Sequence, residues 1–336
     1  MLQRRIAIWA VATPLAIVAI GLFFQGLAAT YPALFFTWGF FLEALLGGLL
    51  QGVMYSLVAL GFVLIFKASG IFNFAQGSLV LFAALTMVGF MEFGVHWVLA
   101  FAITVAIMVV LAIAIERVVL RPMVNQAPII LFMATIGIFY FLDGFGQLLW
   151  GSDIKILDIG IPKNPIFLLE GVFEGGILVN AFDLIAAAVG AVLVAVLAIF
   201  FHKTRIGRAL RAVADDHQAA LSVGIPLKVI WAIVWSVAGI VALVAGIMWG
   251  GKLGVQFSLA LIAFKALPVL ILGGFTSIPG AIVGGLIIGA GEQVAEIFLG
   301  PIIGGAIQDW FAYMLAMVFL LFRPQGLFGE KIIERV

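Results

Sequence analysis

Long hydrophobic runs separated by short polar segments make up most of this chain. Ten runs are predicted to be transmembrane helices, because a helix needs about 20 apolar residues to cross a hydrocarbon core of about 30 Å. The eighth and ninth runs are the least apolar, since they hold Lys265, Pro268, Glu292, Glu296 and many glycines. The predicted spans are residues 6–29, 41–66, 71–91, 95–116, 128–150, 181–201, 227–249, 257–275, 280–299 and 307–322.

The first run follows two arginines, Arg4 and Arg5, as the hydrophobic region of a signal peptide does. It is too long for such a region and lacks a clear small-residue cleavage site. We therefore interpret residues 1–40 as an additional N-terminal span and its link to the next one.

Composition places the chain in a bilayer. Of its 336 residues, 65% are hydrophobic and 10% are charged, whereas a soluble globular chain is about 45–50% apolar and about 25% charged. The chain has no cysteine, so disulfides and thiol chemistry are excluded. We predict an all-α polytopic membrane protein with a single transmembrane domain over residues 1–336.

The basic residues fix the predicted orientation through the positive-inside rule. With the N-terminus inside, thirteen of the seventeen Lys and Arg residues fall on the cytoplasmic side. Lys155, Lys163 and Lys252 fall outside, and Lys265 lies within a span. Both termini are therefore predicted to be cytoplasmic. The ten spans divide into two sets of five. The first set begins on the inside and the second set begins on the outside, as in the inverted repeats of many transporters.

Two connections are long. The external loop, residues 151–180, is predicted to fold over the outer face. The internal loop, residues 204–226, contains a predicted helix over 206–223 that Gly224 ends and Pro226 cannot continue. Its apolar stripe consists of Ile206, Leu210, Val213, His217 and Leu221, and its polar face consists of Arg208, Arg211, Asp215 and Gln218. This helix could lie on the inner leaflet or in a groove of another protein. Its apolar stripe is thin and rich in alanine, which favours the protein groove.

Residues 67–79, KASGIFNFAQGSL, form a polar hinge between the second and third spans. Lys67 helps to fix orientation, and Ser69 and Gly70 break the helix. Asn73 and Gln76 then begin the third span. Unwound backbone at membrane depth is allowed only where protein or water surrounds it. The hinge therefore either faces the subunit interior or the transport path, or it is a plain cytoplasmic turn.

Glycines and intramembrane charges mark further candidate contacts. Three Gly-x-x-x-Gly pairs start at Gly48, Gly280 and Gly285, and they favour close helix packing within the subunit, with a subunit interface as the alternative. Lys265 and Glu292 are candidates for an ion pair with a structural role or a role in transport, because charges inside a span are costly.

Catalytic motifs are not visible in the sequence. The three histidines are scattered, so no metal site is predicted, and no cofactor is expected. There is no G-x-x-x-x-G-K-[ST] phosphate-binding loop. We therefore predict that the chain is not an enzyme and that any ATP is hydrolysed by partner subunits.

Four blocks of sequence resemble the LivH-type permease subunits of branched-chain amino acid ABC transporters. They occur in the family's order and together span residues 47–329. The first span resembles an extension that is not found in the shortest family members. The blocks are GLLQGVMYSLVALGFVLIFKASGIFNFAQGSLVLFAA, IGRALRAVADDHQAALSVGI, LPVLILGGFTSIPGAIVGG and FLLFRPQGLFG.

The resemblance implies a type II ABC importer permease with inverted halves. It implies a second similar permease subunit, two cytoplasmic ATP-binding subunits and an extracytoplasmic substrate-binding protein. It also implies that the internal loop carries a coupling helix that docks in a cleft of the ATPase. The residues assigned to that helix are Gly207, Arg208, Arg211, Ala212, Asp215, Ala219 and Gly224.

We therefore predict a permease of the bacterial inner membrane that carries branched-chain amino acids. Candidate path residues are Asn73, Gln76, Lys265 and Glu292. Related family members carry urea, short amides or other small solutes, and these remain alternatives. A stand-alone secondary carrier or channel and a structural membrane subunit without a path are rival classes.

Overall fold

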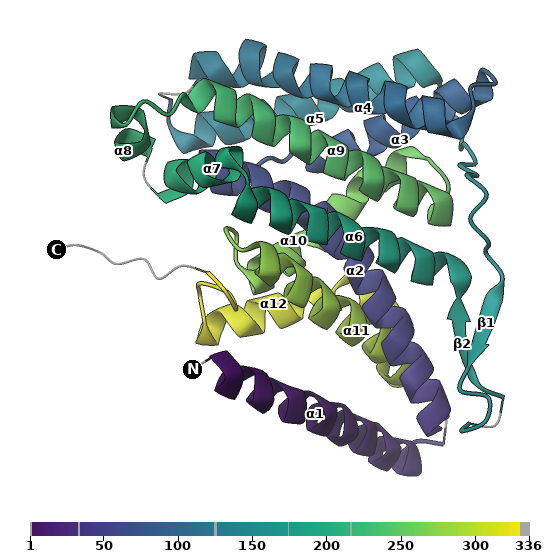
Figure 1. Ribbon diagram of the computed structural model, residues 1–336. Coiled ribbons are helices and arrows are strands. Elements are labelled where there is room, and N and C mark those ends of the chain that lie inside the picture. Colours follow the sequence, from purple (N-terminus) through teal and green to yellow (C-terminus); the bar gives the residue numbers. More distant parts are fainter. Residues whose placement is uncertain (1, 33, 124–125, 174, 216, 330–336) are drawn as a thin grey trace.

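The computed structural model is a bundle of helices with one short β-hairpin at one end (Figure 1). It describes residues 2–32, 34–123, 126–173, 175–215 and 217–329, without the side chains of 2–11, 215 and 217–219. The α-helices are α1 Leu2–Thr30, α2 Trp38–Ser69, α3 Gln76–Glu92, α4 Trp97–Ala114, α5 Pro128–Trp150, α6 Ala181–Lys203, α7 Arg205–Asp215, α8 His217–Ser222, α9 Leu227–Leu253, α10 Ile262–Gly273, α11 Ile278–Ile303 and α12 Phe311–Phe322. The strands are β1 Pro165–Leu168 and β2 Ile177–Asn180; Ile115–Leu120 is a π-helix, and Arg121–Met123, Phe257–Leu261 (η3) and Ile307–Asp309 (η4) are 3₁₀ helices.

The described residues contain ten apolar helices that correspond in order to the ten predicted spans. Seven are long enough to cross a membrane by length and composition. The other three are the shorter helices Gln76–Glu92, Phe257–Gly273 and Phe311–Phe322. The chain is thus a multi-pass helical membrane protein. The third and tenth helices begin later than predicted, because the hinge and a 3₁₀ turn replace their first residues.

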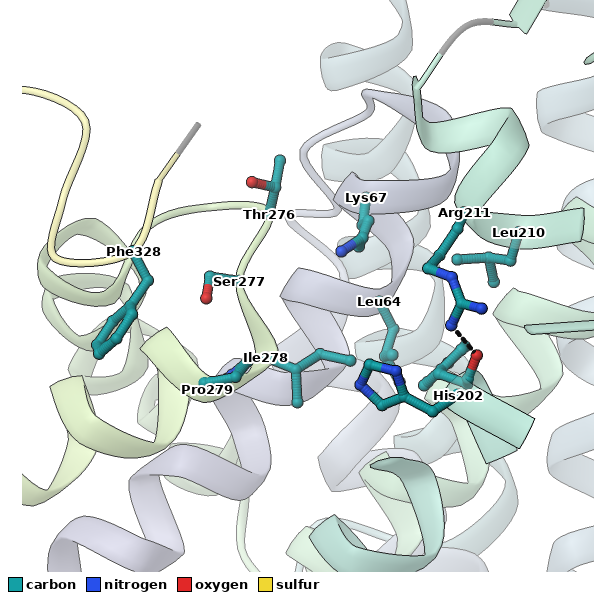
Figure 2. A pocket seen from close by; sticks show the side chains of 11 residues that line it. Leu64, Lys67, His202, Leu210, Arg211, Thr276, Ser277, Ile278, Pro279 and Phe328 are labelled. Atoms are coloured by element: carbon teal, nitrogen blue, oxygen red, sulfur yellow. Dashed lines mark hydrogen bonds between the residues drawn. The ribbon is translucent and has the colours of Figure 1, made fainter. Parts of the chain in front are cut away.

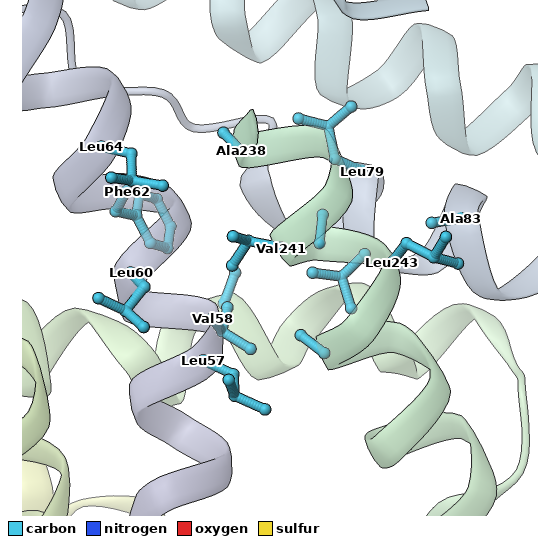
Figure 3. Packing of buried hydrophobic residues seen from close by; sticks show 14 of the residues in the cluster. Leu57, Val58, Leu60, Phe62, Leu64, Leu79, Ala83, Ala238, Val241 and Leu243 are labelled. Atoms are coloured by element: carbon cyan, nitrogen blue, oxygen red, sulfur yellow. The ribbon is translucent and has the colours of Figure 1, made fainter. Parts of the chain in front are cut away.

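Helix α2 forms the centre of the bundle and crosses it obliquely (Figure 1). Its 32 residues extend about 48 Å at 1.5 Å per residue, longer than a hydrocarbon core of about 30 Å. Side chains of α2, α3 and α9, such as Leu57, Leu79 and Val241, are fully buried and pack together in the central cluster (Figure 3). By contrast, α4, α5 and α6 keep large apolar side chains exposed, as expected of faces that meet lipid or another membrane subunit.

The predicted glycine pairs bring α2 and α11 into backbone contact. A Cβ added at Gly48 would lie 2.6 Å from the carbonyl oxygen of Gly289, and one added at Gly285 would lie 2.5 Å from that of Gly52. Only glycine permits this approach. At Gly48, Gly52, Gly285 and Gly289, the prediction of packing within the subunit is confirmed.

The C-terminal part of helix α1 packs on the bundle. Phe24 of α1, Phe41 of α2 and Phe298 of α11 are buried in a small separate cluster of apolar side chains. The Phe24 and Phe298 rings lie 5.0 Å apart. This cluster fastens the additional helix to the two helices that the glycines hold together.

The external loop folds against the bundle, and its two strands were not predicted. Strands β1 and β2 pair antiparallel, with Pro165 opposite Asn180. The N–H of Leu178 donates to the Glu43 carboxylate at 3.2 Å, and this contact joins the hairpin to α2. Asn180 also caps α6, because its Oδ1 accepts from the Phe182 N–H at 2.9 Å.

The internal loop forms two helices, α7 and α8, rather than the single helix predicted over 206–223. Only part of the predicted stripe faces the protein: Leu210 and Val213 are buried, whereas Ile206 and Leu221 are exposed. The predicted end is confirmed. Gly224 adopts φ +81°, and its N–H donates to the Leu221 carbonyl at 3.0 Å.

Candidate functional site

The hinge between α2 and α3 is a buried, non-helical segment that side chains hold in place. Gly70 ends α2 at φ +66°, a left-handed conformation that suits glycine. Asn73 Oδ1 then accepts from the Ala75 N–H at 3.2 Å. The hydroxyl of Thr135, on α5, accepts from the Phe74 N–H at 3.0 Å. The unwound backbone is therefore satisfied by protein groups, as a buried segment requires.

Asn73 and Gln76 are completely buried. Asn73 Nδ2 donates to Gln76 Oε1 at 3.4 Å, and the Gln76 amide packs against the backbone of Gly61 on α2. Gln76 Nε2 has no hydrogen-bond partner among the described residues. In this conformation the two buried amides thus hold the hinge in place, and a solute cannot reach them.

Aromatic side chains cover the other side of the hinge. Phe74 packs edge-on against Phe139 of α5 and Phe264 of α10, with ring centroids 5.6 and 5.7 Å apart. Together with Phe72 and neighbouring apolar residues, these rings enclose a cavity of about 10 Å³. Such a cavity has room for about one water molecule and none for an aliphatic side chain, so the aromatic surface is closed.

Asp143 lies one helical turn from Phe139 on the same side of α5 and is half-buried. It forms no ion pair with any described residue. A carboxylate within a span seldom faces lipid, since the cost is several kcal/mol. This part of α5 therefore suits contact with water or with another protein. Asp143 was not among the predicted site residues, although an acidic residue inside an apolar run is a visible signal in the sequence.

Lys265 and Glu292 meet in the half of the bundle that is predicted to be external. Lys265 Nζ lies 2.9 Å from Glu292 Oε1 and 3.3 Å from Asp309 Oδ1. Tyr55 of α2 donates to the same Glu292 oxygen at 3.3 Å. Glu292 is almost completely buried. The predicted ion pair is present in the structure, and it ties α2, α10 and α11 to the turn before α12.

A cavity of about 240 Å³ lies at the opposite end, which is predicted to be cytoplasmic (Figure 2). Its lining includes one residue from each of the four sequence blocks described above: Lys67, Arg211, Ser277 and Phe328. His202, at the end of α6, completes its basic lining. Sequence order alone does not bring these blocks together, but the fold gathers them around one space.

The start of α7 is folded tightly back on α6. The Thr204 hydroxyl accepts from the Gly207 N–H at 3.0 Å. A Cβ at Gly207 would lie 2.6 Å from the carbonyl carbon of Phe201, so the elbow requires glycine. Arg211 donates to the Phe201 carbonyl oxygen and is half-buried, which corrects the prediction that it lies on the solvent face.

The outward face of α7 contains Arg205, Arg208 and, more covered, Ala212. These residues are spaced three and four apart, so they share one side of the helix. The side chains of Asp215 and Ala219, also assigned to the coupling helix, lie outside the described residues. Gly224 lies beyond the face, in the turn that leads into α9.

Comparison with known proteins places the chain in a family. The family model for the permease component of the branched-chain amino acid transport system matches residues 44–323. The high-affinity branched-chain amino acid transport system permease protein BraD of Pseudomonas aeruginosa is 31% identical over 88% of this chain and 98% of its own length. LivH of Escherichia coli K12, which has the same descriptive name, is 29% identical over 88% of this chain and 98% of its own length.

Among solved structures, PsaBC from Streptococcus pneumoniae in complex with Fab is similar, with a TM-score of 0.42 and 15% identity. The similarity covers 83% of this chain and 90% of that one. From the sequence match, the chain belongs to the branched-chain amino acid transport system permease family. Helix α1 precedes the part that the family model matches.

Proposed function

We propose that this member of the permease family is the membrane-spanning subunit of an ABC importer that carries leucine, isoleucine and valine into the cytoplasm. The match over residues 44–323 carries the proposal. Relatives named for high-affinity branched-chain amino acid transport align with this chain over 98% of their own length. The ten apolar helices have the form that such a subunit needs.

ATP binding would come from partners, because the sequence has no phosphate-binding loop. The proposed assembly has a second similar permease subunit, two cytoplasmic ATP-binding subunits and an extracytoplasmic substrate-binding protein. It lies in the bacterial inner membrane with both termini of this chain in the cytoplasm. The ATPase would contact the outward face of α7 at Arg205, Arg208 and Ala212. Asp215 and Ala219, whose side chains lie outside the described residues, are proposed as further contacts.

The aromatic surface beside the hinge would form one wall of the path. Aliphatic side chains gain free energy against apolar and aromatic groups, so the rings of Phe74, Phe139 and Phe264 suit leucine, isoleucine and valine. Asp143, one turn away, would attract the substrate ammonium group. Opening requires the hinge to move, since the cavity between the rings is too small for a substrate.

The candidate path residues have indirect roles in this proposal. Asn73 and Gln76 would hold the hinge that presents Phe72 and Phe74 to the path. Lys265 and Glu292 would join the helices around its external half and would separate if those helices moved apart. Both pairs would therefore control the shape of the path rather than bind the substrate.

Reconstitution tests the assignment. Purified complex in liposomes should accumulate leucine only with internal ATP and the binding protein outside. This chain alone, given a proton or sodium gradient, should accumulate none. Concentrative uptake by the chain alone would refute the ABC assignment in favour of a secondary carrier, and ATP-driven uptake of urea or short amides in place of leucine would refute the substrate.

A further inference from the structure

The cavity at the predicted cytoplasmic end has an unbalanced positive lining (Figure 2). Lys67, His202 and Arg211 line it, and none of its described lining residues is acidic. Lys67 forms no ion pair with any described residue and is only partly exposed. Among the described residues, Arg211 donates to the Phe201 carbonyl oxygen alone, and a guanidinium group has five N–H donors. The cavity therefore favours an anion.

The N-terminus of α11 adds to the positive electrostatic potential in the cavity. Ser277 caps the helix, with its hydroxyl accepting from the Gly280 N–H at 3.0 Å, and it lines the cavity together with Thr276. The helix is 26 residues long, and the positive end of its dipole points to the same space. Basic side chains of two kinds and a nearby hydroxyl are the donors that proteins use for phosphate oxygens.

Exposed apolar side chains of α6 precede His202, which lines the cavity. On α6, Val192, Val196 and Ile199 are each more than half exposed and share one side of the helix. His202, at the cavity, follows them one turn later. An acyl chain lying along this stripe would bring its headgroup to the basic lining. Inorganic phosphate has no acyl chain, so it would gain nothing from contact with this apolar stripe.

We propose that this cavity binds the phosphate of an anionic phospholipid, with Lys67 and Arg211 as its cationic partners and the acyl chains lying along α6. The chemistry distinguishes between headgroups. Phosphatidylglycerol offers a phosphate and an uncharged diol, whereas the ammonium group of a zwitterionic lipid would be repelled by Lys67. None of the candidate path residues lines this cavity of about 240 Å³, so the proposed lipid site is separate from the proposed path.

Native mass spectrometry of the full chain in detergent tests the site. Phosphatidylglycerol should bind the delipidated protein more tightly than phosphatidylcholine. Lys67→Gln should weaken phosphatidylglycerol about fivefold, since a basic residue near an anionic lipid contributes about 1 kcal/mol. Lys67→Arg should restore binding. Lys228→Gln is the matched control, because Lys228 is an exposed lysine at the start of α9 and does not line the cavity. Equal losses in Lys67→Gln and Lys228→Gln would overturn the proposal.

A second measurement keeps Lys67 intact and locates the lipid. The chain has no cysteine, so Thr276→Cys gives a single thiol in the cavity and Arg208→Cys gives one on the outward face of α7. Phosphatidylglycerol should slow maleimide labelling of the first and leave the second unchanged. Absence of protection at Thr276 would overturn the location. Protection by millimolar inorganic phosphate but not by the lipid would overturn the lipid source.

Discussion

Gly48→Ala tests whether the contact between α2 and α11 holds this bundle together, and Gly47 provides a neighbouring control. A Cβ at Gly48 would meet the backbone of α11, 2.6 Å from the Gly289 oxygen and 2.8 Å from the Ala290 Cα. A Cβ at Gly47 would meet no atom within 4 Å. The same substitution at adjacent positions of one helix thus differs only in what the added methyl group touches.

The expected magnitude follows from these distances. Ordinary van der Waals contact begins at 3.4 Å, so the two helices would have to separate by about 0.8 Å to accommodate the methyl group. Overpacking of this kind costs about 1–3 kcal/mol. Alanine in place of glycine also stabilises a helix by about 0.5–1 kcal/mol. Gly47→Ala should show only that gain, so the two variants should differ by about 1–3 kcal/mol.

Denaturant titration of the purified chain in detergent micelles measures the difference, with helix content followed by circular dichroism. Gly48→Ala should unfold at a lower denaturant concentration than wild type, and Gly47→Ala at an equal or higher one. The separation should also lengthen the 3.3 Å bond between Tyr55 and Glu292 on the same two helices. If Gly48→Ala is as stable as Gly47→Ala, the close approach of the helices does not exist in the protein.

Three further outcomes are expected. Lys265→Met should lower the free energy of unfolding by about 3–5 kcal/mol, because it leaves Glu292 buried without its cation. Adding Glu292→Gln should recover part of this loss, whereas additive losses in the double variant would contradict the pairing. Ala212→Trp should abolish ATP-driven uptake in the reconstituted complex while the variant chain still inserts and assembles, and unchanged uptake would remove Ala212 from the ATPase contact. In spheroplasts, a membrane-impermeant thiol reagent should label Ser152→Cys and spare Lys203→Cys, whereas the reverse pattern would invert the predicted topology.

The helices and the glycine contacts could be predicted from the sequence because they depend on local properties. A run of about 20 apolar residues has few alternatives to a membrane span. The spacing of Gly48 and Gly52 indicates a flat helix surface whatever the partner. What the spacing could not give was the partner, which proved to be Gly285 and Gly289 of α11.

The orientation of individual polar side chains could not be predicted. Arg211 was expected on the solvent face because helical spacing placed it opposite the apolar stripe. The fold-back of α7 at Gly207 instead brings the Phe201 carbonyl group within its reach. The hinge depends on Thr135, 61 residues from Phe74. Such contacts follow from tertiary packing. They cannot be predicted from the local periodicity of a single sequence.

The convergence of the four sequence blocks suggests how a movement of α7 would reach the path. Leu210 anchors α7 on its inner side among the buried residues of the bundle. Lys67, at the same cavity, lies near the end of α2, and Phe72 and Phe74 follow in the hinge after it. The hinge is held by a few side-chain hydrogen bonds and not by a helical ladder, so fewer backbone hydrogen bonds break when it changes shape. If a partner displaced α7, the first change in the shape of the path would therefore occur at the aromatic surface.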